Sequence, residues 1–111
     1  MNWLHDVSYL FGGAVMANAV PHLVSGFTGR PFQTPFATPP GKGLSSSTVN
    51  VLWGCANLVV AYLLIALVGM FDWHTADNAI ALGLGVLLMG LIAARLFGRL
   101  HGGDLPTDKG A

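Results

Sequence analysis

Apolar residues gather in three long stretches of the chain, and short polar segments separate them. The stretches run over residues 4–26, 49–71 and 79–98 and are 23, 23 and 20 residues long. At about 1.5 Å per residue, a helix of this length crosses the roughly 30 Å hydrocarbon layer of a bilayer. The pattern predicts an all-α integral membrane protein with three transmembrane helices. Because the spans take up most of the chain, we expect residues 1–111 to form a single membrane domain.

The charge content is also typical of a membrane protein. Only 9% of the residues are charged, whereas a soluble domain carries about 25%. The formal net charge is zero and there is no basic run, so the chain lacks the clustered Lys and Arg that nucleic-acid binding needs. We therefore expect membrane lipid, and not nucleic acid, as a partner.

Basic residues lie on only one side of the three predicted spans. Residues 1–3 and 72–78 contain no Lys or Arg, so all five basic residues belong to the opposite side. The positive-inside rule then puts the N-terminus outside and the C-terminus in the cytoplasm. This orientation predicts a cytoplasmic loop over residues 27–48 and a cytoplasmic tail over residues 99–111. The layout is similar to that of small three-span inner-membrane proteins of bacteria, so a bacterial inner membrane is the expected location.

Four polar residues fall at matching heights in the first two spans. Asn18 lies eight residues before the end of the first span and Asn57 eight residues after the start of the second, so both are about 12 Å from one boundary. His22 and Asn50 lie on the same two helix faces. We expect Asn18, His22, Asn50 and Asn57 to form a polar cluster. It either makes structural hydrogen bonds between helices or uses His22 as a proton or ligand group.

The first loop is rich in proline, glycine and phenylalanine, which excludes a helix or a central strand. Phe32 and Phe36 recur in adjacent PFQT and PFAT repeats and predict a flap held at the membrane interface or against the helices. A second interpretation combines Arg30 and Lys42 with Ser47, near the start of the second helix, as an anion or headgroup contact. The Gly-Lys-Gly order there is not a nucleotide-binding loop.

Small residues follow one face of the third span. Ala79, Gly83, Gly90 and Ala94 fall within a narrow arc at 100° per residue. In lipid, small side chains allow helix backbones to approach closely. These four residues, called the small-residue stripe below, predict a helix association face.

The sequence offers no catalytic or metal signature, since neither an HExxH motif nor a pair of CxxC motifs occurs. No nucleophile has an assignable neighbouring base either. We expect no catalytic residues, no metal and no cofactor.

Three hypotheses for the function follow from these patterns. The leading one is a small non-enzymatic membrane protein that acts as an oligomeric or accessory subunit of a membrane complex, either as a homo-oligomer or with other chains. The first alternative is a small oligomeric transporter or channel whose path is the polar cluster. The second alternative is a membrane enzyme that acts on a lipid-like substrate beneath the loop.

Overall fold

The computed structural model describes residues 1–103, which fold into three long helices. Helix α1 spans Trp3–Phe27, α2 spans Ser47–Tyr62, and α3 spans Ala76–His101. The short π-helix η1, Leu63–Leu67, continues α2. By length and composition, α1, α2 together with η1, and α3 can each cross a membrane. The predicted helical architecture with three membrane-length helices is therefore confirmed.

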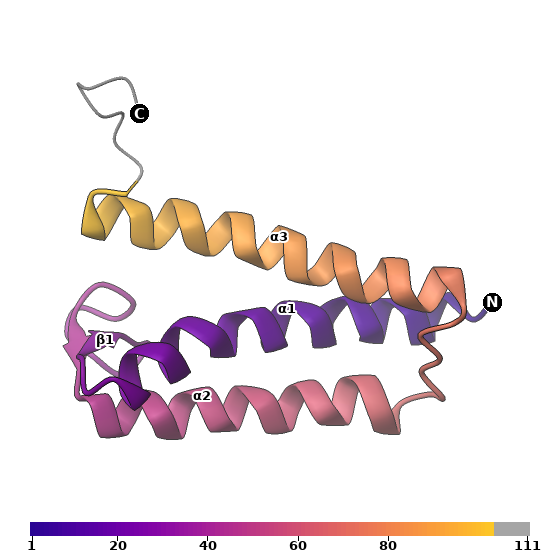
Figure 1. Ribbon diagram of the computed structural model, residues 1–111, viewed down its shortest axis with the longest axis horizontal. Helices are drawn as coiled ribbons and strands as arrows, with labels where there is room; N and C mark the ends of the chain where they lie inside the picture. The colour runs from indigo at the N-terminus through magenta and orange to yellow at the C-terminus, as the bar shows by residue number, and fades with distance from the viewer. Residues whose placement is uncertain (104–111) are drawn as a thin grey trace.

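Helix α1 is the central element of the bundle. It packs along both α2 and α3, whereas α2 and α3 hardly contact each other (Figure 1). Helix α3 runs close to α1 near its own start and diverges from it toward its C-terminal end (Figure 1). We call this divergent end, where the first loop also lies, the loop end of the bundle.

Two glycines set the close approach of α1 and α3 away from the loop end. A Cβ atom at Gly85 would overlap the backbone carbonyl oxygen of Leu10, and one at Gly13 would overlap that of Leu82. Only glycine lets two helix backbones come this close. The sequence positions of these glycines therefore decide where α3 crosses α1.

Helix α3 is longer than the predicted span 79–98 at both of its ends. It continues through Arg99 to its last residue, His101. Gly102 then caps it with a φ of +82°, the left-handed conformation that stops many helices. The predicted span stops before Arg99 because it is defined by apolar residues, but long cationic side chains can continue a helix into the membrane interface. The predicted tail 99–111 thus begins as helix, and residues 104–111 lie outside the described part.

The first loop contains two short strands that the sequence did not predict. Strand β1, Phe32–Gln33, pairs antiparallel with β2, Leu44–Ser45. Each strand has only two residues, and both are edge strands. None of the four prolines of the loop lies in either strand, so no proline interrupts the pairing. Phe32 is buried in the bundle. Phe36 is 65% exposed and packs edge-on against Trp53, with the two ring centroids 5.0 Å apart. The loop therefore folds onto the helices as an ordered cover.

Candidate functional site

The structure brings the four residues of the polar cluster together as two pairs that join α1 to α2. Asn18 Nδ2 donates to Asn57 Oδ1 at 3.1 Å. One turn away, His22 Nδ1 and Asn50 Oδ1 are 2.8 Å apart. Both pairs lie toward the loop end of the two helices, so the hydrogen bonds tie α1 and α2 together directly beneath the loop.

Asn50 links the loop to the start of α2. Its side chain is fully buried, and the two N–H groups of its Nδ2 are shared among three backbone carbonyl oxygens, those of Phe32, Ser45 and Ser46, at 3.1, 3.2 and 3.0 Å. Because three acceptors surround Nδ2, the Oδ1 atom must be the one that faces His22. His22 Nδ1 therefore carries the proton and donates, which leaves His22 Nε2 as a hydrogen-bond acceptor.

The same reasoning assigns the amide orientations in the pair of Asn18 and Asn57. Asn57 Nδ2 donates to the backbone carbonyl oxygen of Trp53 at 2.8 Å, so its Oδ1 faces Asn18 and accepts from Asn18 Nδ2. The remaining oxygen of Asn18, Oδ1, is thereby left as an acceptor as well. Helix α1 consequently offers two acceptor atoms, one turn apart on one face.

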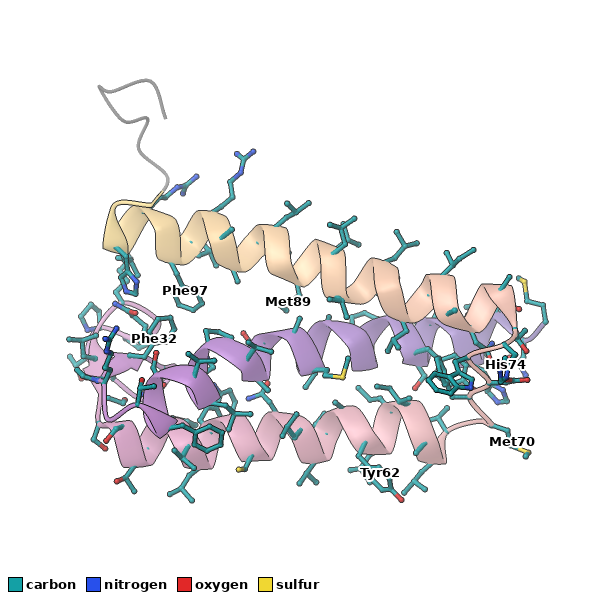
Figure 2. The ribbon with its side chains drawn as sticks, viewed as in Figure 1. Phe32, Tyr62, Met70, His74, Met89 and Phe97 are labelled. Atoms are coloured by element: carbon teal, nitrogen blue, oxygen red, sulfur yellow. The ribbon has the colours of Figure 1, made fainter. Side chains whose placement is uncertain are left out.

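Aromatic rings surround His22 and connect α3 to the loop. The ring of His22 meets those of Phe32, Trp53 and Phe97 edge-on, with centroids 5.4, 6.4 and 6.4 Å away. Phe32 and Phe97 are 4.7 Å apart, and Figure 2 shows them facing each other from the loop and from α3. Next to them, His101 Nε2 lies 2.8 Å from Gln33 Oε1. These contacts hold the divergent end of α3 against the loop.

A pocket of about 680 Å³ lies within this arrangement. All three helices and the loop contribute to its lining, which includes Asn18, His22, Trp53, Phe97, Lys42 and Arg99. Its volume falls in the range of small-molecule sites, which are mostly apolar with a few polar groups. Chemically, the α1 wall offers two hydrogen-bond acceptors, and the loop and α3 add polar side chains, among them Gln33 and Thr34, around the aromatic rings.

Charge is distributed unevenly around the pocket. Lys42 and Arg99 line it with exposed side chains, whereas the described carboxylates, Asp6, Asp72 and Asp77, belong to the opposite end of the bundle. Of the residues predicted as an anion or headgroup contact, Lys42 lines the pocket but Arg30 and Ser47 do not. Within residues 1–103, no group of three or more His, Cys, Asp or Glu side chains could hold a metal ion.

The small-residue stripe lies on an exposed face of α3. Ala79, Gly83, Gly90 and Ala94 are all exposed, and nothing lies within 4 Å of a Cβ atom built at Gly83 or Gly90. Inside the chain, α3 instead turns its Ala81 and Gly85 face toward α1. The stripe is thus available to contacts outside this chain.

Sequence reasoning missed several pocket residues. Trp53 could have been found, because it lies between Asn50 and Asn57 on the same face of α2. Phe97 and Arg99 could not, since nothing in their spacing indicates that the end of α3 lies beside the loop. Gln33 was not predicted either, because its burial depends on the strand pair.

The whole chain was compared with known proteins. No protein-family model matches it, and neither a curated protein nor a solved structure is significantly similar to it.

Proposed function

We propose that this chain is a small, non-enzymatic integral membrane protein that acts as an oligomeric or accessory subunit of a membrane complex, with the small-residue stripe as its association face. The observation that carries the proposal is the exposed stripe, which has no neighbour within the described chain. Lipid tails are as apolar as the helices, so helix association in a bilayer depends on close packing of such small residues.

The shallow burial of α3 supports an external partner. Only 11% of its most apolar 18-residue window is buried, against 28% for α1. Gly90 follows Gly85 by five residues and so lies about 140° around the helix. Helix α3 can therefore hold α1 on one face and a second chain on another at the same time.

The distribution of charge supports one orientation in the membrane. Arg30, Lys42 and Arg99 gather at the loop end, and the described carboxylates at the other. By the positive-inside rule, the loop end faces the cytoplasm and the N-terminus lies outside. We propose an inner membrane of the bacterial kind as the location, with the surrounding lipid and a second protein chain as partners.

Disulfide crosslinking tests the association face. In a Cys55→Ala background, Gly90→Cys is oxidised in native membranes, and Leu91→Cys serves as the matched control at the same height but about 100° around the helix. We expect a crosslinked product, either a dimer or an adduct with a partner chain, for Gly90→Cys alone. Equal crosslinking of both variants would reject the stripe as the interface. A native mass that corresponds to a single chain in lipid would reject the subunit role.

A further inference from the structure

The pocket at the loop end contains a polar atom that the protein leaves without a partner. His22 is only 3% exposed, yet within residues 1–103 its Nε2 forms no hydrogen bond. None of the fully buried side-chain nitrogen and oxygen atoms there lacks a partner. His22 Nε2 must therefore reach the surface of the pocket that His22 lines. A ligand that covers this atom without giving it a hydrogen bond leaves it unpaired, which is costly, so the atom indicates what a ligand must supply.

At the α1 wall of the pocket, the group that a ligand must supply is a hydrogen-bond donor, while Gln33 Nε2 on the loop wall is a donor that a ligand oxygen can meet. Asn50 fixes His22 Nε2 as an acceptor, and Asn57 fixes Asn18 Oδ1 as a second acceptor. His22 and Asn18 lie five and nine residues before the end of α1, which is about 8 and 14 Å along the helix. A donor that reaches them must be carried by a molecule that enters the membrane.

The walls of the pocket favour an aromatic and neutral head. The rings of Trp53 and Phe97 line it, and aromatic pairs gain about 0.5–1.5 kcal/mol beyond the area that they bury. Its two cations, Lys42 and Arg99, are exposed, and lipid phosphates at the interface can neutralise them. The side chains that contact His22 itself, Asn50 and the rings of Phe32, Trp53 and Phe97, are all neutral.

The lining of the pocket is consistent with access from the lipid. Its walls include Trp53 of α2 and Leu96 and Leu100 of α3, and these two helices hardly contact each other. Both leucines are also largely exposed. A long apolar chain can therefore leave the pocket between α2 and α3 while the head remains inside.

We infer that this pocket binds the dihydroxybenzene head of a quinol-type membrane amphiphile, with phenolic O–H groups donating to His22 Nε2 and Asn18 Oδ1. The inference concerns a ligand and stands apart from the proposed association face. It further predicts a preference between redox forms, because a quinone carries carbonyl acceptors in place of the O–H donors. The reduced form should bind more tightly than the oxidised form.

The binding test uses the full chain in nanodiscs under argon, with empty nanodiscs as the baseline. The probes are a decyl-substituted benzoquinol, its quinone and its dimethyl ether, and bound ligand is quantified by chromatography after gel filtration. We expect saturable binding of the quinol, at least about tenfold tighter than that of the ether or the quinone, since each loses the donors. Equal binding of the three probes would overturn the inference. So would equally tight binding of an aliphatic monoacylglycerol.

Two variants locate the binding site. Leu96→Trp narrows the pocket without touching the polar cluster, and Leu91→Trp adds the same bulk on an exposed face elsewhere on α3. We expect Leu96→Trp to weaken quinol binding about tenfold or more and Leu91→Trp to leave it unchanged. His22→Phe should remove the preference for quinol over ether while amide exchange of residues 32–45 reports whether the loop still folds. Wild-type affinity in Leu96→Trp, or a retained preference in a folded His22→Phe, would refute the inference.

Discussion

The two halves of α1 hold their neighbours by different means. Away from the loop end, Gly13 and Gly85 bring the backbones of α1 and α3 into direct contact. At the loop end, α3 diverges, and the rings of Phe32 and Phe97 meet between the loop and α3 (Figure 2). The pocket lies beside these rings. The same helix therefore has one half in which backbones touch and one half that leaves room for a ligand.

A chain of this size can therefore assign stability to one half of a helix and a ligand pocket to the other. Close backbone packing needs no polar groups and specifies one crossing geometry. Polar groups such as Asn50 cost free energy when they are buried, and the cost is recovered only through several hydrogen bonds. We therefore expect substitutions in the packed half to change global stability, and substitutions in the polar half to change the loop.

The largest effect is expected at the helix crossing. Gly85→Leu puts a side chain into the Leu10 backbone, which cannot move aside, and should lower the free energy of unfolding by at least about 3 kcal/mol. The measurement is denaturation by SDS in mixed micelles, followed by a fluorescent pair on α1 and α3. For the single chain dissociated in micelles, Gly83→Leu, on the open side of the same helix, should cost less than about 0.5 kcal/mol. Similar losses for both variants would show that the crossing is not specified by Gly85.

An intermediate and local effect is expected at Asn50. Asn50→Asp keeps the size of the side chain but removes the amide donor from the carbonyl oxygens of Phe32 and Ser45, and an unpaired buried acceptor costs about 1–3 kcal/mol. The Ser46 carbonyl oxygen still accepts from the backbone N–H of residue 50. Amide hydrogen exchange in residues 32–45 should therefore accelerate at least tenfold. Asn57→Leu makes no contact with the loop and is the control. Unchanged exchange in Asn50→Asp would contradict the role of Asn50 as the link between loop and helix.

The smallest effect is expected where η1 meets α1 in the packed half. Ser8 Oγ donates to the carbonyl oxygen of Leu64 at 2.7 Å. Ser8→Ala should lower the free energy of unfolding by about 0.6 kcal/mol, the typical value for a hydrogen bond between membrane helices. The SDS titration measures this change, with Ser25→Ala as the control because its hydroxyl makes no hydrogen bond within residues 1–103. A loss above about 2 kcal/mol would mean that polar groups also hold the packed half together.

The sequence determined the number of helices and the heights of the polar residues along them. Long apolar stretches predict membrane-length helices without any knowledge of packing, because helix rise and bilayer thickness are constants. Their matching depth was likewise enough to predict that Asn18 and Asn57 belong to one polar cluster. The ordered loop was harder to predict, since its strands depend on Asn50, a residue beyond the loop in the chain.

Only the tertiary structure decided which faces meet. The stripe at Gly83 and Gly90 and the face at Gly85 look alike in sequence, because small residues permit close approach wherever they occur. The crossing at Gly85 and the divergence of α3 then carry Phe97 and Arg99 to the pocket beside His22. Periodicity describes one helix at a time, whereas a pocket depends on the angle between helices, and that angle arises from contacts among residues far apart in the chain.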